Sequence, residues 1–296
     1  MEKYKHHIVE TGGHTFHIVS AGQEDGELVL LLHGFPEFWY GFRHQINALA
    51  KAGYRVIVPD QRGYNQSDKP RDIKAYTLDV LRDDCVAFMK AFGRKQAYLI
   101  GHDWGGAVAW HLAASKPELV KKLVAINIPH PADMRVALMK HPFQLFRSAY
   151  MLFFQAPQAP EKLLAARDFA YLEAGMTKTA NERAFTRAEL RHYKTAWRQP
   201  GAMKGMLNWY RAIRFQGLDR KGKLDLPVSV PTRIIWGAND LFLGKALAHA
   251  SLKRCSNGDA VLVDGATHWL HHEHPEIVNH LMLEHLQKQK KRLWPV

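Results

Sequence analysis

The chain has 296 residues, of which 47% are hydrophobic and 23% are charged, and its formal net charge is +13. This length allows one sizeable core with a generous insertion, or two small domains, and the composition is that of an ordinary globular protein. No apolar run approaches the roughly 20 residues that span a membrane, and Met1 to His7 lead into no apolar signal segment. These features argue against a membrane span and a secretory signal.

The positive charge and the two cysteines bear on partners and compartment. Basic residues are spread along the chain, with one dense cluster from Lys288 to Arg292, and no basic motif interleaved with aromatic residues accompanies it. A solvated C-terminal end accounts for this cluster, so we expect no nucleic-acid or membrane partner. Cys85 and Cys255 are far apart, and Cys85 lies in a helical pattern. Free thiols of this kind favour a reducing cytoplasm.

Short apolar runs predict the strands of one sheet, and they cover residues 27–32, 55–59, 97–100, 123–128, 232–236 and 260–263. Runs of this kind, separated by helix-length segments, are typical of a mostly parallel sheet flanked by helices on both faces. Helical patterns fill the intervals, as in residues 78–91 and 275–287. The fold class is therefore α/β.

Residues 130–217 interrupt this alternation, because they contain no credible strand. Methionine and aromatic residues recur there at helical spacings, broken by Pro142 and by the segments 156–160 and 199–201. We predict an inserted all-helical lid at 130–217 between two parts of one core, 1–129 and 218–296. Ligands bind at the carboxyl ends of strands in open α/β sheets, and a lid over that edge would exclude water.

Asp103 lies in the most informative motif. The apolar run 97–100 is followed by Gly101-His-Asp-Trp-Gly-Gly106 and then by a helical pattern. This is the strand, turn and helix of a nucleophile elbow, with a carboxylate in place of the usual serine. A helix cap is the alternative, but a cap alone would not need three glycines. Because an aspartate is ionised at neutral pH, it can attack a saturated carbon directly and form an alkyl ester.

Asp240 and His268 each follow a predicted strand. The order Asp103, Asp240, His268 is that of nucleophile, acid and histidine in the α/β-hydrolase triad. His268 would activate water against the ester, and Asp240 would hold the imidazole tautomer. A turn aspartate and a surface histidine are the alternatives.

Two further motifs concern an oxyanion hole and a metal. Gly34 before Phe35 and Pro36 allows a tight bend, so the Phe35 and Trp104 N–H groups could together stabilise the oxyanion formed when water attacks the ester. A strand-ending turn is the alternative. The group His271, His272, Glu273 and His274 is rich in metal-binding residue types, but no H-E-x-x-H spacing and no second ligand cluster accompanies it. We expect neither a metal nor a cofactor.

Several motifs together resemble the soluble epoxide hydrolases of the α/β-hydrolase superfamily. They are His33-Gly-Phe-Pro-Glu-Phe-Trp-Tyr40, Asp60-Gln-Arg-Gly-Tyr-Asn-Gln-Ser67, Gly101-His-Asp-Trp-Gly-Gly106, Asn127-Ile-Pro-His-Pro131 and Thr267-His-Trp269. The resemblance runs in order from about residue 8 to 286. It implies two lid tyrosines that donate hydrogen bonds to the epoxide oxygen, and Tyr150 and Tyr210 match them. Tyr193 competes by composition, but its context does not match. An opening epoxide leaves as an alkoxide, and phenols can protonate it.

Other activities stay open at this point. A haloacid dehalogenase would be expected to carry arginines where Trp104 and Ala107 stand. A haloalkane dehalogenase would share Trp104 but would need another halide donor, which Phe35 does not offer. A non-catalytic ligand-binding protein on the same fold is a further alternative. The lid composition implies an apolar aryl or alkyl epoxide as substrate, with water as the second reactant. The sequence leaves the individual substrate and the oligomeric state, monomer or homodimer, open.

Overall fold

The computed structural model describes residues 4–215 and 225–288. An eight-stranded sheet lies at its centre, in the order β1-β2-β4-β3-β5-β6-β7-β8. The strands are β1 (Lys5–Thr11), β2 (His14–Ala21), β3 (Leu28–Leu32), β4 (Arg55–Pro59), β5 (Ala97–His102), β6 (Val120–Ile126), β7 (Thr232–Gly237) and β8 (Gly258–Val263). Strand β2 pairs antiparallel with β1 and β4, and the other pairs are parallel. The predicted mostly parallel sheet is confirmed.

Helices cover both faces of this sheet because its strand residues alternate between two apolar clusters. Leu28, Leu30 and Leu32 pack with the side of α2 (Leu78–Ala91) and α3 (Asp103–Ser115). Val29 and Leu31 pack instead with α1 (Arg43–Lys51) and α12 (Pro275–Gln287). Continuous apolar strands are stable only when both faces are buried in this way. The two remaining core helices are α10 (Ala246–Leu252) and α11 (Leu270–Glu273).

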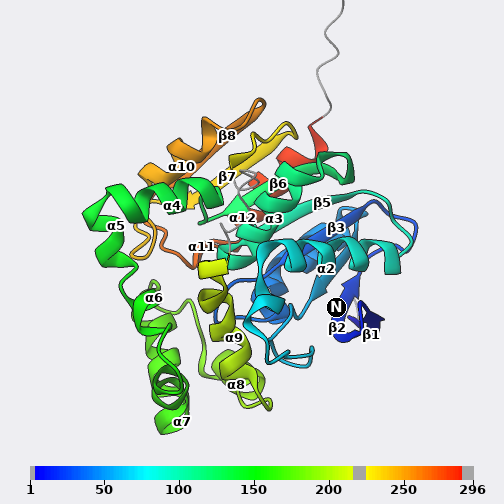
Figure 1. Cartoon of the computed structure of the whole chain (residues 1–296). Helices are drawn as coiled ribbons and strands as arrows, with labels where there is room; N and C mark the ends of the chain where they lie inside the picture. The colour runs from blue at the N-terminus through cyan, green and yellow to red at the C-terminus, as the bar shows by residue number, and fades with distance from the viewer. Residues whose placement is uncertain (1–3, 216–224, 289–296) are drawn as a thin grey trace, which may run out of the picture.

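Between β6 and β7, every regular element that the structure describes is helical, and these helices lie together on one side of the sheet (Figure 1). They are α4 (Pro131–Lys140), α5 (Pro142–Arg147), α6 (Tyr150–Phe153), α7 (Ala159–Thr177), α8 (Arg187–Trp197), α9 (Ala202–Arg211) and the 3-10 turn η4 (Ala212–Phe215). We call α4–α9 the cap. Pro142 begins α5, and Gly201 precedes α9 with φ +79°. The proposed boundary between residues 217 and 218 lies outside the described residues.

Strands β1 and β2 were not predicted. β1 is largely exposed, and β2 carries the buried polar residues His17 and Ser20, so neither shows an unbroken apolar run. Within the described ranges, no helix combines the length and apolar character that a membrane crossing requires. Of the basic cluster at Lys288–Arg292, all but Lys288 falls outside those ranges.

Candidate active site

Asp103 sits at the sharp turn between β5 and α3. Its φ of +48° is in the left-handed region, which an aspartate visits more readily than most residues. A Cβ on Gly105 would lie 2.1 Å from the Leu32 carbonyl oxygen, so only glycine lets α3 start this close to β3. The predicted strand, turn and helix are therefore present. The turn directs the Asp103 side chain to the carboxyl edge of the sheet.

The loop after β3 approaches the Asp103 carboxylate. The Phe35 N–H donates a hydrogen bond of 2.9 Å to Asp103 Oδ1. A Cβ on Gly34 would lie 2.5 Å from Asp103 Cβ, which explains the glycine before Phe35. Trp104 is the second residue of α3, and N–H groups in the first turn of a helix have no acceptor within the helix. Both amides expected to form the oxyanion hole thus lie beside Asp103.

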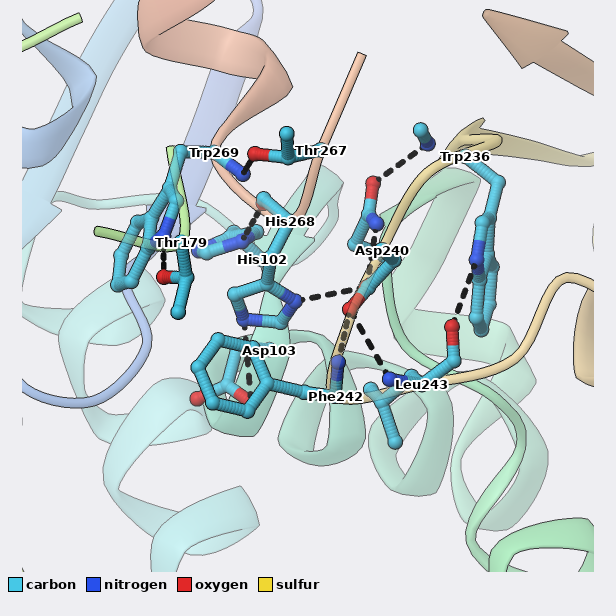
Figure 2. A network of polar contacts seen from close by, with 12 residues as sticks. His102, Asp103, Thr179, Trp236, Asp240, Phe242, Leu243, Thr267, His268 and Trp269 are labelled. Atoms are coloured by element: carbon cyan, nitrogen blue, oxygen red, sulfur yellow. Dashed lines mark hydrogen bonds and ion pairs between the residues drawn. The ribbon is translucent and has the colours of Figure 1, made fainter. Parts of the chain in front are cut away.

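His268 lies between the two aspartates predicted to accompany it (Figure 2). Its Nδ1–H donates to Asp240 Oδ2 at 2.8 Å, and its Nε2 lies 3.8 Å from Asp103 Oδ2. The imidazole is buried, with 3% of its residue surface exposed. Because Asp240 fixes the proton on Nδ1, Nε2 faces Asp103 and the cavity above it. The surface-histidine alternative is therefore wrong.

Asp240 is held from several directions in the loop after β7. Its Oδ1 accepts the backbone N–H groups of Phe242 at 2.7 Å and Leu243 at 2.9 Å. Its Oδ2 accepts the Asn127 amide at 2.6 Å, in addition to His268. Burial by itself raises the pKa of Asp240, but the charge of His268 and these hydrogen bonds hold it below its usual value. Asp240 is thus an anion placed to orient His268.

Asn127 is a residue for which the sequence predicted no role. It follows β6 directly, and its Oδ1 accepts the Gly237 N–H at 2.9 Å while its Nδ2 reaches Asp240. Its position at the carboxyl end of a strand was the available signal, but only the folded chain shows its partner.

The charge state of His268 depends on both carboxylates. Burial alone would lower its pKa, but the Asp240 and Asp103 carboxylates outweigh burial and raise it to about 9. The imidazole of the free protein is consequently protonated at neutral pH. Loss of the Asp103 charge would remove one of these contributions.

Two cavities meet at Asp103, Tyr150 and Tyr210, and their volumes are about 170 and 160 Å³. Tyr150 begins α6 and Tyr210 lies near the end of α9, with 6.0 Å between their ring centroids. Burial, together with the nearby Asp103 charge, raises the pKa of both phenols. Both are hydrogen-bond donors at neutral pH. The remaining walls are largely apolar and include Leu78, Ile128, Met134, Leu138, Met151, Leu164, Leu172, Met176 and Phe242.

Tyr193, the competing tyrosine, belongs to a separate buried network centred on Glu37. Its hydroxyl donates to Glu37 Oε1 at 2.9 Å, and His102 Nδ1 lies 3.2 Å from Glu37 Oε2. The other nitrogen of His102 donates to the His268 carbonyl oxygen at 2.9 Å. The network thus supports the backbone of His268 from behind. The sequence did not reveal it, because these residues are far apart in the chain.

The same network brings Glu37, His271 and His272 together, with one potential ligand atom from each within 4.8 Å of the others. The sequence could not reveal this group, since Glu37 is distant from the two histidines along the chain. Arg43 Nη1 donates to His272 Nδ1 at 2.9 Å, so His272 Nε2 carries its proton and donates to Glu37 Oε1 at 2.7 Å. That nitrogen has no lone pair for a metal. Glu273 instead accepts the Thr267 N–H at 2.8 Å.

Comparisons with known proteins agree with this architecture. Residues 27–275 match the family model described as the alpha/beta hydrolase fold. The AB hydrolase superfamily protein YfhM of Bacillus subtilis is 49% identical, over 98% of this chain and 100% of its own. Epoxide hydrolase 4 of Mus musculus is 38% identical, over 96% of this chain and 79% of its own. The epoxide hydrolase structure from Bacillus megaterium is 29% identical with a TM-score of 0.85, covering 95% of this chain and all of that one.

The order of the strands, the aspartate elbow and these relatives lead to one assignment. This assignment excludes the non-catalytic ligand-binding protein that the sequence left open. The chain is a hydrolase of the α/β-hydrolase superfamily and belongs to the part of that superfamily that contains the epoxide hydrolases.

Proposed function

We propose that the protein is an epoxide hydrolase that converts apolar aryl or alkyl epoxides to vicinal diols, with Asp103 as nucleophile. One observation carries the proposal: the cavity walls above the Asp103 carboxylate present two protonated phenols, Tyr150 and Tyr210. An alkoxide is a poor leaving group unless an acid is placed on its oxygen, and these phenols supply that acid. A halide departs without taking up a proton, so a dehalogenase would not need an acid at this place.

The first half-reaction forms an ester. Asp103 Oδ2, on the side facing His268, attacks an epoxide carbon, and the carbon–oxygen bond of the ring breaks. Tyr150 and Tyr210 donate hydrogen bonds to the departing oxygen, and one of them transfers its proton. Because Oδ1 is held by the Phe35 N–H at 2.9 Å, the carboxylate is oriented before substrate binds.

The proton on His268 accounts for the proton that the opened epoxide takes up in the catalytic cycle. Once Asp103 becomes a neutral ester, the pKa of His268 falls, and its proton replaces the one that the tyrosine gave up. Neutral His268 then takes a proton from water, which attacks the ester carbonyl. The Phe35 and Trp104 N–H groups stabilise the oxyanion. Collapse of the tetrahedral intermediate releases the diol, restores the Asp103 carboxylate and leaves His268 protonated again.

A comparison of leaving groups tests the function. Styrene oxide and 1-bromohexane are offered to the protein under identical conditions, with Asp103→Ala as the inactive control. We expect kcat/KM for the epoxide to exceed that for the bromide at least roughly a hundredfold, the lower end of a general-acid contribution. Faster turnover of the bromide would make the protein a dehalogenase.

The pH dependence follows from the raised pKa of His268. Protonated His268 replaces the proton that the tyrosine gives up in ring opening, and without this proton the alkoxide can close the ring again, so kcat/KM is expected to fall as pH rises through about 9. Ionisation of Tyr150 and Tyr210 does not contribute to this fall in kcat/KM, because the pKa values of both phenols are raised as well. The measurement is kcat/KM for styrene oxide from pH 6 to 10.5. In Asp240→Asn the falling limb should move to lower pH, because the largest source of the raised pKa is removed. A flat profile to pH 10.5 would contradict this role.

We also place the protein in the cytoplasm. Cys85 and Cys255 are both free thiols, which favours a reducing compartment. Water and a small apolar epoxide are its proposed partners in the reaction.

A further inference from the structure

The outer surface of the cap is unusually apolar. Nine of the twelve large hydrophobic residues that are exposed among the described residues belong to the cap, from Val136 to Tyr171. Phe143, Phe146, Met139 and Leu152 are 86%, 84%, 79% and 68% exposed. They lie on the consecutive short helices α4, α5 and α6, and α5 is at the outer edge of the cap (Figure 1). We call these four residues the apolar cap face.

A surface of this kind needs a partner. Phe143 and Phe146 are three residues apart on α5, so their rings project from the same side of the helix. Single exposed apolar residues are common in proteins, but a group of large ones on adjoining helices marks a binding surface. The cap interior does not need these side chains, since the walls around Asp103 are supplied by other residues.

The charged residues of the segment that carries the face are all of one sign. From Met134 to Pro160 the sequence contains no aspartate or glutamate, whereas Arg135, Lys140 and Arg147 all occur there. Asp133, just before this stretch, is paired with Arg254 at 2.7 Å. The segment that carries the apolar cap face therefore contributes positive charge only, on a chain whose net charge is +13.

We propose that the apolar cap face docks on the surface of an anionic lipid bilayer, which replaces the expectation from the basic cluster at Lys288–Arg292 that the protein has no membrane partner. Large apolar side chains that enter the acyl boundary, beside cations that meet lipid phosphates, are the features of interfacial helices. A second copy of this chain fits less well. A two-fold symmetric interface would bring Arg135, Lys140 and Arg147 of one copy toward the same residues of the other.

The location also connects the membrane with the active site. Arg135 is exposed and at the same time lines the cavity that contains Asp103, together with Met134 and Leu138 of α4. The cavity thus reaches the surface on the helix that carries Met139. An apolar epoxide concentrates in lipid, so docking would place the cavity near its source. This last step rests on the proposed function, whereas the docking itself does not.

Vesicle co-sedimentation without substrate tests the docking. The full chain is mixed with vesicles of phosphatidylcholine alone, or of phosphatidylcholine with phosphatidylglycerol. We expect binding to the anionic vesicles that weakens with salt. Phe143→Ser/Phe146→Ser should lose roughly tenfold or more in partition coefficient, and Lys140→Glu roughly fivefold or more. Ile277→Ser and Lys90→Glu are the matched controls, at exposed positions on α12 and α2, and should bind as the parent does.

Two outcomes would overturn the proposal. One is equal binding by the parent and the Phe143→Ser/Phe146→Ser variant. The other is no binding by the parent, combined with a parent dimer that this variant converts to monomer in sedimentation velocity, which would make the face an interface between copies. Turnover of a small water-soluble epoxide, expected to be unchanged in the variant, confirms that it is folded. Failure of the proposed function would appear as no epoxide turnover by the parent, whatever the vesicle result.

Discussion

His268→Gln is expected to stop the reaction after the first half, with one equivalent of epoxide consumed and no second turnover. Glutamine cannot take a proton from water, but Asp103 still attacks, because the Phe35 N–H continues to hold its Oδ1. Loss of a triad member typically lowers kcat by ~10⁴–10⁶-fold. The measurement is rapid-quench consumption of styrene oxide at a known enzyme concentration.

Asp103→Ala is the matched control for this experiment. It should remove the burst as well as steady turnover, since no ester can form. The fold should persist, because the Asp103 carboxylate lines the cavity. The substitution leaves unchanged the glycines of the turn, which make the close contacts with neighbouring backbone. Equal loss of both half-reactions in His268→Gln would instead assign His268 a purely structural role.

Tyr150→Phe/Tyr210→Phe is expected to slow ring opening by ~10²–10⁴-fold, the usual contribution of general-acid catalysis. Each single variant should lose less, because the remaining phenol still donates to the epoxide oxygen. Single-turnover fluorescence can follow the ester forming, since Trp104 directly follows Asp103 in the cavity wall. Hydrolysis of a preformed ester, which depends on His268 and Asp240, should change much less.

Tyr171→Phe is the control for the tyrosine pair. Tyr171 lines one of the two cavities but is 46% exposed, and it has no part in the proposed ring opening. Its loss should leave ring opening near the parent rate. If the double variant opened epoxides at that rate too, both tyrosines would be packing residues and the epoxide assignment would lose its chemical basis.

Most of the core fold could be predicted because its strands are continuous apolar runs. Residues 55–59 and 97–100, for example, fall within β4 and β5. Strand β2 could not be found in this way, because His17 and Ser20 interrupt its apolar pattern. The buried His17 finds a partner in Asp60, far along the chain, which accepts its Nδ1–H at 2.6 Å. A polar residue with a distant partner has no local signature.

In the active site too, some residues could be predicted from local sequence patterns and others could not. Asp103, Asp240 and His268 could be predicted because each lies in the turn or loop after a strand, and parallel strands end at one edge of the sheet. Glu37, His102 and Asn127 were not predicted to support them, since their roles depend on contacts between distant segments. The apolar residues of the lid were expected to line a pocket. Met134 and Met151 do so, whereas Phe143 and Phe146 face outward, a distinction that composition cannot make.

The most direct test of the central claim is the mass of His268→Gln protein after one exposure to styrene oxide. We expect the protein to gain the mass of one epoxide, and peptide sequencing by mass spectrometry to locate it on the Asp103 side chain. The same treatment of the Asp103→Ala/His268→Gln variant should give no addition. An adduct on another residue, or an unmodified Asp103 in protein that has consumed one equivalent of epoxide, would contradict the aspartate-ester mechanism.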